Sequence, residues 1–189
     1  MIKVIDNFII KQDQLFIQNH LLENFGTFPW FYNKSTELDF HISLSKNELD
    51  TPQMTHQFKE IGVDGVIETF KFILPVLARI NQPLVNYDRI KTNLCFNISN
   101  NTIKKHQLIH KDWDEDDRYS MLYYVNDSDG DTLFFDNKKK KIIKRVAPKM
   151  GRLVIFDAMI PHAGCNPINN NERCVINLVI KKDYINQLI

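Results

Sequence analysis

The first half of the chain carries apolar residues at helical spacing after one short strand-like segment. IKVIDNFI (residues 2–9) is typical of a strand, whereas QLFIQNHLLENF (residues 14–25) repeats its apolar positions as an amphipathic helix does. A second helix is predicted over residues 64–81, with a kink at Pro75. The apolar residues that repeat on one face of this second helix are Phe70, Ile73, Leu77 and Ile80. Residues 1–86 are therefore expected to form a helical support region.

From Tyr87 onward the pattern changes to short β-rich runs separated by turn residues. The runs are RIKTNLCFNI, HQLIHKD, YSMLYYV, DTLFFD, IIKRVAP, GRLVIFDA and CVINLVIK. Many short strands with connections too short for helical crossovers are typical of an antiparallel sandwich or barrel. We predict a mainly β (α+β) fold, a double-sheet jelly roll over residues 87–182 with the N-terminal helices packed on one sheet. The 189 residues contain no linker or repeat, which indicates one domain.

The charge balance excludes a strong electrostatic field around the whole protein. Lys and Arg total 24 and Asp and Glu total 23, a formal net charge of +1, so no nucleic acid or membrane partner is expected. The three cysteines are widely spaced, unlike a disulfide framework, and are interpreted as reduced thiols. The sequence has no signal-peptide core and no run long enough to span a bilayer. These features predict a cytoplasmic protein. They do not distinguish a monomer from an oligomer.

Two histidines and one aspartate stand out in the β-rich half. His110 and Asp112 are two residues apart in HKD, so on a strand their side chains share a face. His162 lies 50 positions after Asp112 in GRLVIFDAMIPHAG, and facing strands of a jelly roll can bring it opposite the pair. Two imidazoles and one carboxylate leave metal positions open, as in non-haem Fe(II) oxygenases. Taken singly, HKD is more simply a solvated strand end, and His162 a turn residue.

Arg173 begins the last apolar strand in NNNERCVINLVI, 11 positions after His162. A cation at the mouth of a buried strand is costly unless an anion meets it, and a carboxylate would satisfy it with two parallel hydrogen bonds. Without the histidines, Arg173 is more simply a surface residue whose stem packs against the sheet.

HKD, PHAG and ER, in this order and spacing, resemble the Fe(II)/2-oxoglutarate-dependent dioxygenases, and in detail their prolyl 4-hydroxylase branch. The resemblance covers about residues 90–180 and implies a double-stranded β-helix, which is a jelly roll. It implies that Fe(II) is bound by His110, Asp112 and His162. It also implies that Arg173, where many prolyl hydroxylases have lysine, binds the distal carboxylate of the cosubstrate 2-oxoglutarate.

The resemblance places two further residues near the cosubstrate. Tyr124 in YYVND matches a tyrosine whose hydroxyl reaches the same carboxylate. Thr132 in DGDTLFF matches a frequent threonine, although Asp129 replaces the first of two usual glycines. Trp113, on the acidic loop after Asp112, is a candidate substrate-binding residue.

The activity implied by the resemblance is hydroxylation of a peptidyl or free amino-acid side chain, with release of succinate and carbon dioxide. The expected partner is thus a small-molecule or peptide substrate, and the resemblance admits ascorbate as an auxiliary reductant. The charges of such a site balance, because Fe(II) offsets the 2-oxoglutarate dianion and Arg173 offsets Asp112. A water-poor cavity favours this balance.

A non-catalytic jelly roll could use the same pocket to bind a metal or small anion, and tightly held zinc with four protein ligands would favour it. A zinc hydrolase lacks an obvious general base. A calcium loop in DWDEDD fails because Asp117 and Tyr123 replace the required Gly and Glu. Val179 replaces the second arginine of the alkylation-repair branch, and His106 is interpreted as a structural or rim residue.

Overall fold

The computed structural model describes residues 1–23, 28–34, 51–60, 63–64, 67–98, 106–138 and 141–185. The strands are β1 (Ile2–Ile5), β2 (Phe31–Asn33), β3 (Gln53–Glu60), β4 (Val63–Asp64), β5 (Tyr87–Phe96), β6 (Arg118–Tyr124), β7 (Thr132–Phe135), β8 (Ile142–Val146), β9 (Leu153–Asp157), β10 (His162–Gly164) and β11 (Glu172–Lys181). The α-helices are α1 (Lys11–Gln18), continued by a π-helical segment over Asn19–Glu23, and α2 (Leu74–Ile80). Short 3-10 helices cover Ile67–Phe72, Leu84–Asn86 and Lys182–Tyr184.

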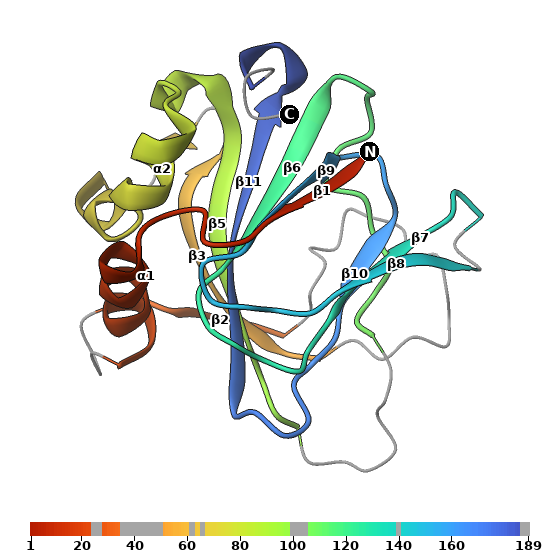
Figure 1. Ribbon diagram of the computed structural model, residues 1–189, viewed down its shortest axis with the longest axis horizontal. Helices are drawn as coiled ribbons and strands as arrows, with labels where there is room; N and C mark the ends of the chain where they lie inside the picture. The colour runs from red at the N-terminus through yellow and green to blue at the C-terminus, as the bar shows by residue number, and fades with distance from the viewer. Residues whose placement is uncertain are drawn as a thin grey trace.

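The strands form two antiparallel sheets (Figure 1). The large sheet has the order β1-β9-β6-β11-β5-β3-β2, with β4 paired to β3, and the small sheet has the order β10-β7-β8. Backbone bridges from His106 to Cys165 and from His110 to His162 place residues 106–110 along the free edge of β10. An apolar cluster that joins β6, β9 and β11 to β7 and β8 packs the sheets together. The predicted jelly roll is confirmed.

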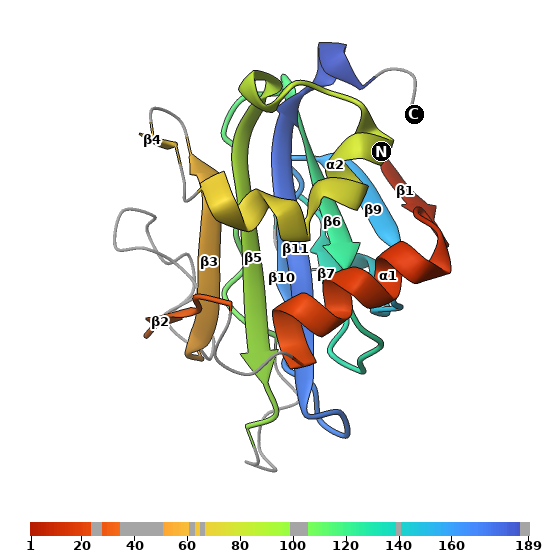
Figure 2. The same ribbon diagram turned by 90° about the vertical axis from the view of Figure 1, so that its left-hand side faces the viewer.

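Helices α1 and α2 cover the outer face of the large sheet (Figure 2), as predicted. Successive residues of β11 point to opposite faces of the sheet. Ile176, Leu178 and Ile180 are fully buried on the helix side, in the same apolar cluster as residues of α1 and α2. Burial of each such side chain stabilises the fold by about 1.5–3 kcal/mol. This packing fixes the register in which Arg173 and Asn177, on the opposite face, point into the jelly roll.

Helix α2 begins differently from the prediction. Pro75 lies in the first turn of a separate α-helix instead of kinking one long helix. A proline in the first turn has no preceding carbonyl to obstruct and lacks only an N–H that would be unpaired there. The helix ends at Asn81, which adopts the left-handed conformation with φ 58° and ψ 47°. The predicted apolar face is buried as expected.

Residues 1–86 contribute strands to the large sheet as well as helices. β1 extends the sheet beyond β9, and β3 and β2 extend it beyond β5. Strand β3 is not among the predicted strands, because QMTHQFKE alternates weakly and is mostly polar. Its conformation is set by pairing with β5, from Met54 opposite Leu94 to Lys59 opposite Ile90.

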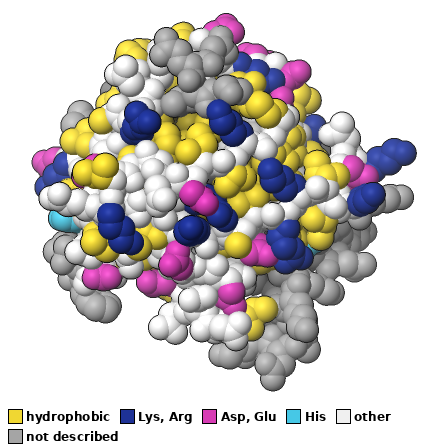
Figure 3. Space-filling view, viewed as in Figure 1, with side chains coloured by type: hydrophobic (Ala, Val, Ile, Leu, Met, Phe, Trp, Pro, Cys, Tyr) yellow, Lys and Arg dark blue, Asp and Glu magenta, His cyan; other side chains and the backbone are white. Residues whose placement is uncertain are grey.

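Basic and acidic side chains are mixed over the face of the molecule seen in Figure 3, with hydrophobic side chains between them. This distribution agrees with a formal net charge of +1. Within the described part of the chain, no helix combines the length and the apolar character needed to cross a bilayer.

Candidate active site

His110 and His162 are direct neighbours across an antiparallel bridge. The amide of His110 donates to the carbonyl of His162 at 3.0 Å, and the amide of His162 donates back at 2.9 Å. Directly opposed residues place their side chains on one face, and the two ring centroids are 4.5 Å apart. Asp112 follows two residues later, and its amide donates to the Ala158 carbonyl at 3.1 Å.

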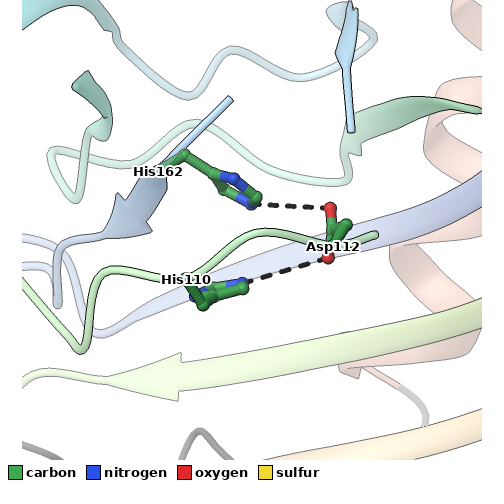
Figure 4. Close-up of side chains that lie close together, drawn as sticks. All are labelled: His110, Asp112 and His162. Atoms are coloured by element: carbon green, nitrogen blue, oxygen red, sulfur yellow. Dashed lines mark ion pairs between the residues drawn. The ribbon is translucent and has the colours of Figure 1, made fainter. Parts of the chain in front are cut away.

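The three side chains point toward one another (Figure 4). Nε2 of His110 lies 3.9 Å from Oδ1 of Asp112, and Nε2 of His162 lies 3.5 Å from Oδ2. One candidate ligand atom from each residue lies within 4.8 Å of the other two. The structure therefore brings together all three predicted metal ligands, although residues 106–112 form isolated bridges instead of the expected regular strand.

Both imidazole rings are held in the tautomer that leaves Nε2 free for a metal. Nδ1 of His110 lies 3.1 Å from the Leu108 carbonyl oxygen, and Nδ1 of His162 lies 3.0 Å from the Ile160 carbonyl oxygen. Because a carbonyl oxygen only accepts, each Nδ1 carries the proton. Burial, reinforced by His162, lowers the pKa of His110 to about 3, and burial also lowers the pKa of His162. Both rings are thus neutral, as metal binding requires.

Asp112 is a buried carboxylate fixed by three donors that sequence analysis did not identify. Ser120 Oγ donates to Oδ2 at 2.7 Å, Asn177 Nδ2 lies 3.3 Å from both oxygens, and Arg89 forms an ion pair with Oδ1. Burial alone would raise the pKa of Asp112, but nearby positive charge, foremost Arg89, holds it well below its usual range. The carboxylate is therefore ionised and oriented.

A second polar cluster joins Arg173, Thr132 and Tyr124. Arg173 Nη2 and the Tyr124 hydroxyl both donate to Thr132 Oγ1, each at 2.7 Å. Burial raises the pKa of Tyr124, so its hydroxyl stays protonated. A threonine hydroxyl accepts two hydrogen bonds and donates one, so the Thr132 proton remains available for a bound ligand.

The guanidinium of Arg173 is buried without a matching anion. Arg173 is only 4% exposed, and its Nε has no hydrogen-bond partner. Among the described residues, no carboxylate forms an ion pair with it. An uncompensated buried charge is strongly destabilising, so this end of the pocket is suited to an anionic ligand.

The turn before Thr132 retains a close approach that only glycine permits. A Cβ on Gly130 would lie 2.5 Å from the Cys165 carbonyl oxygen and 2.9 Å from Cδ of Arg173. Asp129, which replaces the usual glycine, accepts the backbone N–H groups of Ile168 at 3.0 Å and Asn169 at 2.8 Å. Asp129 therefore ties its own turn to the loop at residues 168–169.

One pocket is lined by members of both clusters. Its lining includes His110, His162, Thr132 and Arg173, together with unpredicted side chains from β3, β5 and β11. Arg173 is 4% exposed, whereas the His110 side chain is 30% exposed, so the pocket is deep at Arg173 and opens near His110. The charge balance expected from the sequence was incomplete, because Lys91 in the lining and Arg89 beside Asp112 add two positive charges.

Trp113 and His106 lie outside both clusters. Trp113 packs against Arg118, whose guanidinium carbon is 5.0 Å from the ring centroid, and does not line the pocket. His106 meets the Phe135 ring edge-on, with centroids 5.0 Å apart. Neither residue reaches the candidate ligand atoms.

The residues fit Fe(II) and 2-oxoglutarate. Two neutral imidazoles and one carboxylate on one side of an ion form the facial set typical of non-haem Fe(II), whereas structural zinc takes four protein ligands. Within the described ranges, no fourth His, Cys, Asp or Glu joins the cluster, so coordination positions would stay open. The unpaired Arg173 in the same pocket suits the second carboxylate of a dianion.

Comparisons with solved structures agree with this geometry. A prolyl hydroxylase from Trichoplax adhaerens, in complex with a hypoxia inducible factor peptide, is 17% identical, covers 99% of this chain and 86% of its own, and has a TM-score of 0.59. A Pseudomonas putida prolyl-4-hydroxylase is 14% identical over 96% of this chain and 92% of its own, with a TM-score of 0.53. The non-heme alpha ketoglutarate dependent epimerase SnoN from nogalamycin biosynthesis is 10% identical, covers 95% of this chain and 78% of its own, and has a TM-score of 0.61. These likenesses establish the shared fold.

A family model matches the C-terminal part of the chain. No curated protein sequence matches the chain. The family model of the 2OG-Fe(II) oxygenase superfamily matches residues 96–181, which contain both polar clusters. The jelly roll, the two histidines and aspartate, and the buried arginine are thus all in place in a chain whose residues 96–181 match the model of the 2OG-Fe(II) oxygenase superfamily.

Proposed function

We propose that the protein is an Fe(II)- and 2-oxoglutarate-dependent hydroxylase, formed by a single domain, that acts on an amino-acid side chain, free or within a peptide. The observation that carries this proposal is that the two histidines of the open three-ligand cluster and the unpaired Arg173 line one pocket. The fold shared with two prolyl hydroxylases, one of them holding a peptide, supports the substrate class.

When bound, Fe(II) and 2-oxoglutarate supply the oxidising chemistry, in which dioxygen is consumed, 2-oxoglutarate yields succinate and carbon dioxide, and the substrate gains a hydroxyl group. The chain supplies position and charge. His110 and His162 would hold the ion through Nε2 while their Nδ1 protons remain on backbone carbonyls. Asp112 would hold it through its carboxylate, which Ser120 and Asn177 keep in orientation.

At the deep end of the pocket, Arg173 would bind the distal carboxylate of 2-oxoglutarate. Arginine offers a planar fork of donors that matches a carboxylate in two parallel hydrogen bonds. The free proton of Thr132 would add a third bond, and Tyr124 would hold the Thr132 hydroxyl in place.

Aromatic side chains keep water from one side of the site. The Phe156 ring packs edge-on against His162 with centroids 4.8 Å apart, and Phe134 is 6.1 Å away. Both phenylalanines are fully buried. Low local polarity strengthens the electrostatic contacts inside the pocket.

Two further assignments belong to this proposal. Trp113 directly follows Asp112 and precedes an exposed acidic loop. It would contact the substrate at the rim of the pocket. We infer a cytoplasmic location because Cys95, Cys165 and Cys174 are all unpaired, as is usual in a reducing compartment.

The proposal is tested by incubating Fe(II)-loaded protein with 2-oxoglutarate and oxygen and measuring succinate. Slow succinate formation is expected even without substrate, and Asp112→Ala should abolish it while its folding is checked by circular dichroism. Absence of succinate, together with absence of 2-oxoglutarate binding without oxygen, would refute the proposal. Zinc that copurifies with four protein ligands would instead favour a non-catalytic binding module.

A further inference from the structure

Strand β5 lines the pocket with a row of inward side chains that the proposed metal and cosubstrate sites do not use. Lys91 and Asn93 both line the pocket, since residues two apart on a strand share a face. In the register with β11, Lys91 is opposite Asn177 and Cys95 is opposite Arg173. The pair Lys91 and Asn177 thus lies about 13 Å along the strands from the pair Cys95 and Arg173. It lies at the end of the pocket where Asn177 contacts Asp112.

Lys91 is a half-buried cation without a dedicated partner. Its ammonium donates no hydrogen bond to any part of the chain that the structure describes. The two carboxylates whose charge acts on it, Asp112 and Glu60, are already engaged, the first by Arg89 and the second by Gln57. Burial, and then the charge of Arg89, lowers the pKa of Lys91 to about 8, so the amine stays largely protonated at neutral pH.

The charges around the proposed centre leave an excess that the cosubstrate does not neutralise. Fe(II) offsets the 2-oxoglutarate dianion, and one of the cations Arg89, Lys91 and Arg173 offsets Asp112. Two positive charges remain in and beside a pocket with buried walls. Because uncompensated charge is costly there, a substrate that brings negative charge would bind better than a neutral one.

The pocket wall formed by β5 and β11 also carries two amide oxygens that receive no hydrogen bond from the described residues. Asn177 Oδ1 and Asn93 Oδ1 are buried, and neither has a hydrogen-bond partner within the described residues. The orientation of Asn177 is fixed because its Nδ2 faces the Asp112 carboxylate, which only accepts. These oxygens therefore suit N–H groups of a ligand whose anionic group reaches Lys91.

From this placement we infer that Lys91 binds a carboxylate of the primary substrate, so that the enzyme oxidises an amino-acid substrate carrying a free carboxylate. The carboxylate would come from the backbone end of a free amino acid or from an aspartate or glutamate side chain in a peptide. Arg173 already serves the distal carboxylate of 2-oxoglutarate in the proposed function, on which this inference rests. The more exposed end of the pocket, near His110 and Lys91, is where a second molecule can enter.

The test is a titration of Mn(II)-loaded protein, saturated with 2-oxoglutarate and kept free of oxygen, in a calorimeter. Three series of probes are used: free L-amino acids, peptides blocked at both ends that contain aspartate or glutamate, and blocked peptides of neutral residues that include proline. We expect a carboxylate-bearing series to bind. Binding of free amino acids alone identifies the backbone carboxylate, whereas binding of the acidic blocked peptides identifies the side-chain carboxylate.

Variants of Lys91 decide whether the lysine is responsible. Lys91→Met should lower the affinity for the carboxylate probe that binds by about tenfold or more, whereas Lys91→Arg should change this affinity by less than about threefold. The affinity for 2-oxoglutarate should stay within about threefold in both variants. Lys181→Met, which removes an exposed lysine at the end of β11, is the matched control and should change nothing.

Three results overturn the inference. The first is binding of neutral blocked peptides alone. The second is carboxylate binding that survives Lys91→Met unchanged. The third is a tenfold loss of 2-oxoglutarate affinity in Lys91→Met, which would assign Lys91 to the cosubstrate. A protein that takes up no 2-oxoglutarate fails at the earlier step and overturns the proposed function together with this inference.

Discussion

Replacing Arg173 with leucine removes the unpaired cation from the deep end of the pocket. Arg173 is 4% exposed, and its Nη2 donates to Thr132, so other guanidinium N–H groups are available to a ligand. A carboxylate bound there would receive two hydrogen bonds between charged groups, each contributing about 1.5–3 kcal/mol. We expect Arg173→Leu to weaken 2-oxoglutarate binding by about 3–4 kcal/mol, or roughly 150- to 700-fold.

The assay is calorimetric titration of Mn(II)-loaded protein without oxygen, using 2-oxoglutarate and 2-oxopentanoate. The second ligand has the same keto acid but a methyl group in place of the distal carboxylate. The wild-type protein should strongly prefer 2-oxoglutarate, whereas Arg173→Leu should bind the two ligands about equally. The double-mutant cycle then isolates the interaction between the guanidinium and the distal carboxylate.

A variant that keeps the wild-type preference for 2-oxoglutarate would refute the assignment, because another group would then hold the distal carboxylate. Mn(II) affinity is measured in the same samples to exclude general damage to the site. Arg173→Lys is the matched variant: it keeps the charge but loses the fork, and should fall between wild type and leucine.

Four further outcomes are expected. Thr132→Val should weaken 2-oxoglutarate binding by about 1–1.5 kcal/mol, roughly six- to twelvefold, in the same titration, because it removes one hydroxyl donor. Ser120→Ala should lower Mn(II) affinity by about 10- to 100-fold in competition with a chelator, because Asp112 loses a donor at 2.7 Å. In metal-free protein, the free energy of unfolding in urea should fall as the pH is lowered from 6.5 to 5. The lowered pKa values of His110 and His162 mean that the unfolded state binds more protons there, giving up to about 1.4 kcal/mol per pH unit for each ring. Leu178→Ala should destabilise the fold by about 2–5 kcal/mol in the same unfolding assay, because Leu178 is fully buried between β11 and the helices.

Three of these outcomes have a control variant, and the Ser120→Ala outcome has a result that would contradict it. Thr132→Ser keeps the hydroxyl and should retain most of the 2-oxoglutarate affinity. His110→Gln should reduce the pH slope, and an unchanged slope would show that His110 is not a source of it. Leu178→Met should lower the free energy of unfolding by less than about 1.5 kcal/mol. Unaltered metal affinity in Ser120→Ala would mean that Asn177 and Arg89 alone orient Asp112.

The fold was predictable where the chain alternates or runs continuously apolar. The run CVINLVIK became β11, because both faces of that strand are buried, one under the helices and one inside the jelly roll. β3 was not predictable in this way, since its polar sequence pairs with β5 through backbone contacts that leave no local pattern. The strand expected over residues 106–112 is reduced to bridges at His106 and His110, because its neighbour β10 has only three residues.

The candidate ligands were identifiable because their spacing is distinctive, but the residues that orient them were not. Arg89, Ser120 and Asn177 are single polar residues within strands, and only the three-dimensional register directs them at Asp112. A weak signal existed for Asn177, an amide inside an apolar strand and four residues from Arg173, hence on the same face. Lys91 gave no comparable signal, since lysine in a strand is usually at a solvated surface.

Both edges of the large sheet are strands from the first 60 residues, β1 beyond β9 and β3 with β2 beyond β5. A fragment starting at residue 96 would keep every chemistry-bearing residue of the two clusters yet lose nearly all of β5, leaving β9 and β11 with bare backbone edges. It would also expose Ile176 and Leu178 to water. Such an excised fragment should aggregate, and any minimal scaffold engineered from this protein has to carry its N-terminal half along.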